Sequence, residues 1–414
     1  SSMRYKKTSK TVTAIAEELG VGAILEGSVR RAGPRVRIVA HLINPQTEQL
    51  LWGETFDRQL ADVFEVQTEV AERISGALSV ALSPEEKQRV DRKPTGNPDA
   101  YNLYLLGRHH VNKWSEASVQ KAIDYFQLAI AKDPRYAVAY AGLADAYELL
   151  SIGFGPKPAV ECLVEAKVMA LKALGLDDTL AEAHTSLAYA VWLGDLDWSG
   201  AEREFKRAIE LNANYVMARE WYAEYLAALG RHDEALAEIK SAQQLDPLSV
   251  PVNRAAGWVH YFSRCFAEAV VELRKALVMD PDFLGARLVL WWVLVAEGAT
   301  EEAIADIRKE VERPGSGSVK KLMLAYACAA AGRQEEARGI LWELEAKLVS
   351  EDRLALLSAF PLTALGEKDR AFQQLERAYQ HRDPGLMFLK VAPWLDPLRS
   401  DPRYGALAER LGIV

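Results

Sequence analysis

The stretch GRHDEALAEIKSAQQLDP, residues 230–247, decides the fold, because close variants of it recur along the chain. The next copy, RCFAEAVVELRKALVMDP, occupies residues 264–281, a shift of 34 residues. One alanine keeps this spacing through six units, at Ala201, Ala235, Ala269, Ala303, Ala337 and Ala371. A fixed period of this length indicates a small helical unit that is stacked many times and buries its apolar face against its neighbours.

Two further signals fix the register of the unit. A glycine stands five residues before the repeated alanine in most units, and Arg264 takes that place in one of them. An apolar residue follows the alanine after four positions and a small residue after seven, which places all three on one helix face. Ala235, Ile239 and Ala242 form one such set, and Pro247 ends the unit. The pattern predicts a helix, a glycine turn and a second helix that a neighbour approaches closely at alanine.

These features resemble tetratricopeptide repeats, which are helical hairpins of the same length and pattern. The resemblance covers residues 98–385 and implies a mainly α chain, an α-solenoid of about eight hairpins. It weakens around residues 153–158, around residues 314–318, and at Pro361, where we expect a kink. Residues 386–414 are expected to form a capping segment, with a helix from Trp394 to Leu411 over the open end of the array.

Residues 1–90 do not share the repeat. Runs of β-branched and alternating residues predict strands over residues 23–31, 35–42 and 50–56, with a turn at Gly33-Pro34. Amphipathic patterns predict a short helix over Val12–Leu19 and a longer one over Ala61–Leu82. We therefore expect a small α/β domain before the repeats.

This part, with its order LEGSVRR, RVRI, LI and LW, resembles the TolB amino-terminal-like domain over about residues 5–80. The family's first strand and helix would precede Ser1, so the resemblance implies a truncated domain and a fragment of a longer protein. In that family the upstream part is often a winged-helix DNA-binding domain, a class III nucleotide cyclase domain or a Ser/Thr kinase domain.

Composition narrows the class of protein. The 414 residues are 50% hydrophobic and 26% charged, which is typical of a folded chain, and we find no apolar run of about 20 residues that would suit a membrane helix. Residues 1–95 carry 14 Lys and Arg against 13 Asp and Glu, a net charge of +1, so residues 96–414 carry −9 and the whole chain −8. An acidic array is a poor match for nucleic acid. Three scattered cysteines favour a reducing compartment, hence the cytoplasm, with an extracytoplasmic site if a membrane helix lies upstream.

The resemblance to tetratricopeptide repeats also implies which residues face a partner. In that family the first helix of each hairpin lines a concave groove, and the matching positions here are mostly aromatic. Two interpretations stay open: the rings bind an apolar peptide or helix, or they pack on one another as core. The candidate groove residues are Tyr189, Trp192, Glu224, Arg254, Trp258, Tyr261, Trp292, Tyr326 and Phe360.

A second candidate is the basic hairpin of the α/β domain. The strand after Gly33-Pro34 alternates basic and apolar residues, so one of its faces is cationic. Arg30, Arg31, Arg35 and Arg37 would contact an anionic ligand or an acidic partner, or they form a solvated strand face that discourages edge pairing.

Motifs for chemistry are absent from the sequence. Seven histidines include no HExxH and no Cys–His spacing, and residues 315–321 lack the full phosphate-loop pattern. We therefore expect no catalytic residue, no metal and no cofactor in these residues. The sequence predicts a non-catalytic protein-binding and sensory module of a bacterial signalling or transcription-regulating protein, of undetermined oligomeric state. Two alternatives remain: the regulatory region of a larger cyclase or kinase, and a cell-envelope assembly scaffold.

Overall fold

The computed structural model describes residues 5, 8–33, 35–59, 63–78, 83, 87, 95–154, 157–313 and 317–413. The chain divides into two compact units. The first comprises residues 1–102 and 132–135, and the second comprises residues 103–131 and 136–414.

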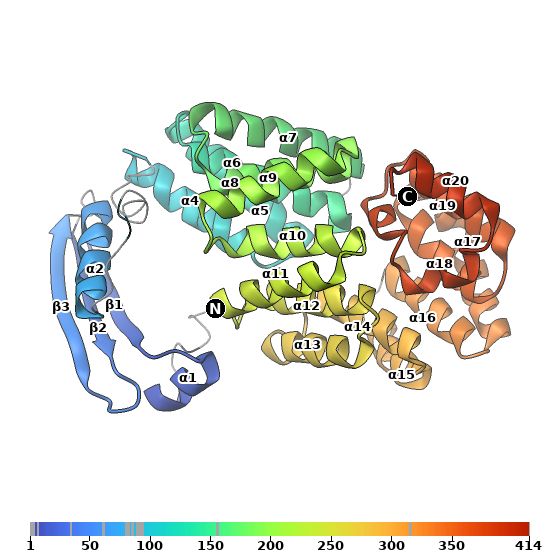
Figure 1. Ribbon diagram of the computed structural model, residues 1–414, viewed down its shortest axis with the longest axis horizontal. Coiled ribbons are helices and arrows are strands. Elements are labelled where there is room, and N and C mark those ends of the chain that lie inside the picture. The colour runs from blue at the N-terminus through green and yellow to red at the C-terminus, as the bar shows by residue number, and fades with distance from the viewer. Residues whose placement is uncertain are drawn as a thin grey trace. The chain divides into compact units, whose positions relative to one another are not determined.

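The first unit contains an antiparallel sheet in the order β1-β2-β3. The strands are β1 Ile24–Ala32, β2 Arg35–Ile43 and β3 Leu50–Gln59, so the three strands expected from the sequence are confirmed. The helices are α1 Val12–Leu19 and α2 Val63–Ala77, and α2 lies across one face of the sheet (Figure 1). The helix expected over residues 61–82 is therefore confirmed over 63–77, while positions 61–62 and 79–82 lie outside the described residues.

The helices from α4 to α19 pair into eight hairpins in the described part of the chain, which confirms the expected helical solenoid. Successive hairpins stack side by side from cyan through green and yellow to orange in Figure 1. The pairs are α4 Pro98–Val111 with α5 Glu116–Lys132, α6 Ala137–Leu149 with α7 Ala159–Leu176, α8 Ala181–Ala190 with α9 Trp198–Leu211, α10 Val216–Ala228 with α11 His232–Leu245, α12 Val250–Phe262 with α13 Phe266–Met279, α14 Leu284–Glu297 with α15 Thr300–Val311, α16 Ser318–Ala330 with α17 Gln334–Ser350, and α18 Ala355–Ala364 with α19 Lys368–Gln380.

The six repeated alanines explain how tightly the hairpins stack. Each of them is 0% exposed, and each lies on the second helix of its hairpin. A methyl side chain at this position lets the neighbouring helix approach closely, whereas a larger one would push it away. The alanines repeated every 34 residues thus lie where helices of the array contact one another.

The second hairpin and two later positions depart from the pattern, as the sequence suggested. After α6 the backbone continues as the π-helical turn η3 Leu150–Phe154 before α7 begins. Residues 155–156 of this longer connection and residues 314–316 of the later one lie outside the described residues. Pro361 lies inside α18, where its ring nitrogen donates no hydrogen bond to the preceding turn.

One close contact near the start of the array gives a stability prediction. The ring of Phe126 is 0% exposed, and a Cβ built on Gly142 would meet it at 2.7 Å. We expect Gly142→Ala to lower the free energy of unfolding by about 1–3 kcal/mol through overpacking. Gly339 is also helical but has open space around its Cβ position, so Gly339→Ala should raise the free energy by about 0.5–1 kcal/mol. Urea titrations followed by circular dichroism measure both, and equal effects would contradict the packing argument.

The chain beyond α19 differs from the expected continuous helix. Only α20 Pro402–Arg410 is helical in the α sense, and it packs on α19 through the ion pair Arg410–Glu376 at 2.7 Å. Residues 384–398, here called the strap, form two 3-10 turns, η6 Pro384–Phe388 and η7 Pro393–Leu398. Pro393 and Pro397 remove backbone donors that a continuous α-helix would need, which is why the helix begins only at Pro402.

Candidate partner-binding face

The first helices of successive hairpins, from α8 to α18, together form one surface of the second unit, here called the inner face. Seven of the candidate residues on it form the aromatic stripe: Tyr189, Trp192, Trp258, Tyr261, Trp292, Tyr326 and Phe360. The structure brings the last five together, because ring centroids lie 5.1 Å apart for Trp258–Trp292 and 5.3 Å apart for Trp292–Phe360, and Tyr261 and Tyr326 contact the same rings. Tyr189 and Trp192 lie 5.8 Å apart at the end of the stripe nearer the N-terminus.

Adjacent tryptophans on α14 separate the stripe from the hairpin interior. Trp291 is 1% exposed, and its indole nitrogen donates to Asp306 of α15 at 2.8 Å. Trp292 turns the other way and contacts Trp258, Tyr261 and Phe360. A helix places consecutive side chains about 100° apart, so only one of the two rings reaches the inner face.

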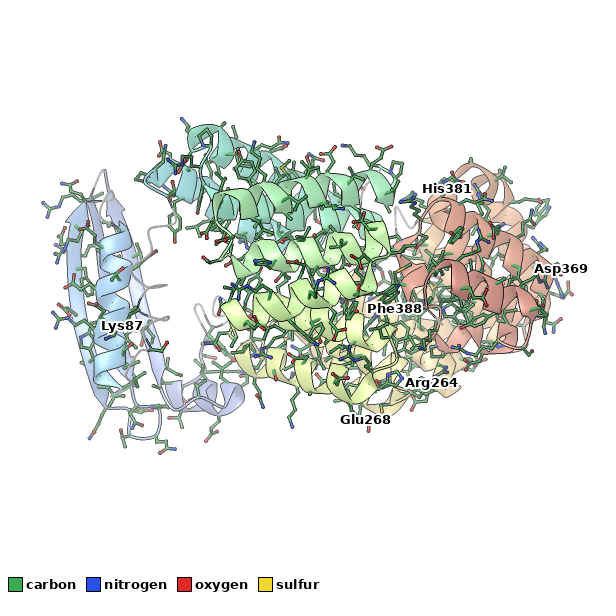
Figure 2. All side chains as sticks on the ribbon, turned by 45° about the horizontal axis from the view of Figure 1, so that its top comes forward. Lys87, Arg264, Glu268, Asp369, His381 and Phe388 are labelled. Carbon is green, nitrogen blue, oxygen red and sulfur yellow. The ribbon has the colours of Figure 1, made fainter. Side chains whose placement is uncertain are left out.

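The strap lies on the aromatic stripe. The ring of Phe388 stacks on Phe262 at 4.6 Å with an angle of 6° and meets Trp258 edge-on at 5.2 Å. The ring of Trp394 stacks on Phe360 at 3.9 Å. Figure 2 shows Phe388 where the yellow-green central hairpins meet the red C-terminal ones (Figure 2). The stripe is therefore not an open groove, because its rings pack on one another and a segment of the same chain covers them.

The fit between strap and stripe is close. Leu386, Leu389 and Leu395 are each 1% exposed, and a Cβ built on Gly385 would lie 2.4 Å from the side chain of Leu356 on α18. A gap of about 50 Å³ remains between the strap and the rings, with room for a few water molecules. The strap thus fills the space that a bound peptide would need.

The two charged candidates pair with each other. The Arg254 guanidinium donates to the Glu224 carboxylate at 2.6 Å and lies 3.8 Å from Glu220, one turn earlier on α10. It also lies over the rings of Trp114 and Trp258, at 4.9 Å and 5.8 Å from their centroids. Arg254 is 8% exposed, so it neutralises the buried Glu224 carboxylate of its own chain rather than offering a free cation to a ligand.

A family model described as tetratricopeptide repeat matches residues 193–250, the second helix of the third hairpin and the whole of the fourth hairpin. The match agrees with the 34-residue period and with the hairpins on either side. Residues 193–250 of the helical array are thus tetratricopeptide repeats.

Relatives and solved structures with similar sequences or repeats belong to several kinds of protein. The chain is 34% identical over 200 residues to "Putative adenylate cyclase 3" of Rhizobium meliloti (strain 1021), covering 48% of this chain and 34% of that one. It is 25% identical over 165 residues to the transcriptional regulator HilA of Salmonella typhimurium, covering 40% of this chain and 29% of that one. A tetratricopeptide-repeat protein of Thermus thermophilus matches with a TM-score of 0.39 and 19% identity, over 47% of this chain and 99% of that one. The chain spans about a third of the length of the curated relatives it matches.

Glu220 on the inner face of the tetratricopeptide array gives a pH prediction. Burial raises the pKa of this carboxyl from 4.5 to about 8, although Arg254 lowers it. Because the folded chain holds the proton more tightly, the stabilising contribution of this group is complete below about pH 4.5 and is lost as the pH rises through 8. We expect the free energy of unfolding to fall between about pH 4.5 and pH 8, and Glu220→Gln to reduce that slope. Urea titrations across this range measure it, and identical slopes for the two chains would contradict it.

The basic hairpin lies in the first unit, and its arginines are partly neutralised. The side chains of Arg35 and Arg37, on β2, both bind Asp57 of β3, at 3.0 Å and 2.8 Å. The hydrogen bond from Arg37 and the contacts of Arg35 lower the pKa of Asp57. Arg30 pairs in register with Arg37 across β1 and β2, while the side chain of Arg31 lies outside the described residues. An anionic contact at this hairpin stays a prediction.

Two features are absent from the described residues, a metal-binding group and a membrane-spanning helix. These residues contain no group of three or more His, Cys, Asp or Glu residues arranged to hold a metal ion. None of the helices described here combines the length and apolar character that crossing a membrane requires.

Sequence reasoning missed the strap and Glu220. The strap had a readable signal, since Leu386, Met387, Phe388 and Leu389 form an apolar run too long for a solvated connection. Glu220 stands four residues before Glu224, which places both carboxylates on the same side of α10. That spacing would have predicted a shared partner for the two carboxylates, but not its identity as Arg254.

Proposed function

We propose that this chain is the protein-binding part of a bacterial signalling or transcription-regulating protein, and that the inner face captures a segment of a partner protein. The observation that carries this proposal is the strap, because it is a peptide segment seated on the aromatic stripe. Buried aromatic anchors in fitted pockets are the groups that dominate peptide binding. The names of the two relatives, a cyclase and a transcriptional regulator, support a regulatory role, and we propose that it is carried out in the cytoplasm.

The α/β unit has a proposed role as well. We propose that it is a TolB amino-terminal-like domain and that it relays partner binding to an output domain of the longer protein. The order of its strands and helices supports this assignment.

A second candidate function is the regulatory region of a larger enzyme. The 34% identity to a relative named as an adenylate cyclase favours it over the kinase alternative. The complete product of the reading frame would then convert ATP to cyclic AMP, at a rate that changes when the inner face is altered. A complete product without cyclase activity would contradict this candidate.

Site-specific photo-crosslinking in cells tests partner capture. Benzoylphenylalanine in place of Trp292 puts the reactive group on the inner face, and the same residue in place of Trp342 puts it on a side chain that is 77% exposed on α17. We expect discrete intermolecular products from position 292 and none of the same mass from position 342. Intermolecular products only from position 342 would move the binding surface elsewhere and contradict the proposal.

The double variant Trp258→Ala, Trp292→Ala tests whether the chain loses its partner when the two rings are removed. The crosslinking residue, benzoylphenylalanine, is then placed at a neighbouring position of the inner face. We expect the amount of crosslinked partner to fall at least tenfold, because two aromatic anchors are removed. Circular dichroism at working temperature is the control, and a loss of helix would show that the two rings are needed for folding.

A further inference from the structure

Two hairpins of the array carry a larger residue in place of the turn glycine, Leu196 in the third and Arg264 in the fifth. Gly230, Gly298, Gly332 and Gly366 all have φ between 74° and 89°, the left-handed region that suits glycine. Arg264 stands in the same place after α12 and has φ 63°. An arginine in this backbone conformation is strained relative to glycine, as Leu196 is at φ 59°, and Arg264 adds a charged side chain that makes a contact of its own.

That contact is with the strap. The Arg264 guanidinium binds the Asp396 carboxylate through two parallel bonds, Nη1–Oδ2 at 2.7 Å and Nη2–Oδ1 at 2.9 Å. Partial burial raises the pKa of Asp396, but the hydrogen bonds from Arg264 and Arg399 lower it overall. Two parallel bonds of this kind fix the orientation of a carboxylate as well as its position. Arg264 therefore acts as a receptor for one acidic side chain.

The strap is held in the way that a bound peptide is held. Three of its side chains meet the array at three places: Phe388 at Phe262 and Trp258, Trp394 at Phe360, and Asp396 at Arg264. Among the described residues, its backbone-to-backbone hydrogen bonds join positions within the strap and its immediate flanks. Because no described strand or helix of the array shares a backbone ladder with it, side-chain anchors determine its place.

The ion pair is the weakest of these anchors. The Arg264 and Asp396 side chains remain 42% and 47% exposed, and exposed pairs contribute little to stability. A competing segment can therefore replace this contact first, from solvent, before it reaches the buried rings. Displacement of the strap by a competing segment thus begins at this exposed ion pair.

We propose that the strap is an internal ligand, and that the partner of the inner face is a protein segment that reproduces its anchors and binds by displacing it. Such a segment carries two large aromatic side chains six residues apart and a carboxylate two residues after the second one. The inference rests on the proposed function, since it names the ligand class of the same face.

The probe is a labelled synthetic peptide with the sequence of residues 383–399, added to the full chain. Asp396→Lys in the chain places a cation beside Arg264 and Arg399, so it weakens the strap while leaving the receptor intact. We expect the peptide to bind this variant at least tenfold more tightly than the unmodified chain. Asp369→Lys is the matched control, because that carboxylate is 94% exposed on α19 and pairs with Arg403 away from the strap. It should leave peptide affinity unchanged.

Peptide variants test the anchors. A peptide with alanine at both Phe388 and Trp394 should bind the Asp396→Lys chain at least tenfold more weakly than the unmodified peptide. Equal binding of both peptides, or no binding of either to a chain that circular dichroism shows to be folded, overturns the inference.

Hydrogen exchange on the unmodified chain covers the case in which Asp396→Lys fails to fold. Saturating peptide should remove the protection of amides in residues 386–398 while α10 to α14 stay protected. Unchanged protection of the strap overturns the inference. If the crosslinks from position 292 persist while the peptide fails to bind, the ligand class is wrong and the proposed function stands. If those crosslinks are absent, the proposed function fails and this inference with it.

Discussion

Trp394→Ala lowers the free energy of unfolding of the helical array by about 3–5 kcal/mol. The indole is 8% exposed and stacks on Phe360 at 3.9 Å, so its removal leaves a cavity against the stripe and ends an aromatic contact. A urea titration followed by far-ultraviolet circular dichroism gives the value. The same experiment reports the surface released on unfolding, because the slope of the transition scales with that area.

Trp342→Ala is the matched control for this prediction. It removes the same side chain from a position that is 77% exposed on α17, and we expect a change within about 0.5 kcal/mol. A cost below about 1 kcal/mol for Trp394→Ala would contradict the strap's position on the stripe, because a buried indole costs more to remove.

Arg254→Met has the second large effect. The change removes the cation that lies 2.6 Å from Glu224 and 3.8 Å from Glu220, and it leaves the buried Glu224 carboxylate without its partner. Removing one partner of a buried ion pair costs about 3–5 kcal/mol, and we expect a loss of that size at pH 7. Thermal and urea unfolding both measure it.

Two further variants separate charge from packing at Arg254. Adding Glu220→Gln and Glu224→Gln to Arg254→Met should recover most of the loss, since no uncompensated charge then remains buried. Arg274→Met is the control, because Arg274 and Glu302 are 55% and 54% exposed and such pairs contribute about 0–1 kcal/mol. Failure of the triple variant to recover would place the cost in packing over Trp114 and Trp258 instead.

The repeated part of the fold was predictable because its contacts are local. The spacing of Ala235 and Ala269 reflects contact between adjacent hairpins, so period and register could be read from residues a few tens of positions apart. The same register placed Trp258 and Trp292 on one face, and the structure brings those rings to 5.1 Å. Local pattern thus predicted the hairpins and the composition of the stripe.

The place where the strap packs could not be predicted, because its contacts are distant in sequence and follow no period. Asp396 meets Arg264 across 132 positions, and Leu411 accepts a hydrogen bond from Trp198 across 213 positions. In the first unit, the pairing of Asp57 with Arg35 and Arg37 depends on the strand register, which alternation alone leaves open. These contacts decide whether a charged or aromatic side chain is available to a ligand.

The long-range contacts of the tail have a mechanical consequence. In an array of helical hairpins, each hairpin contacts only its neighbours, so small changes at each contact can alter the length and twist of the array. Here the tail links α9, α12 and α18 through Trp198–Leu411, Arg264–Asp396 and Phe360–Trp394, so those hairpins cannot change their spacing independently. We therefore expect the hairpins from α9 to α18 to move relative to one another less with the strap in place than after its release.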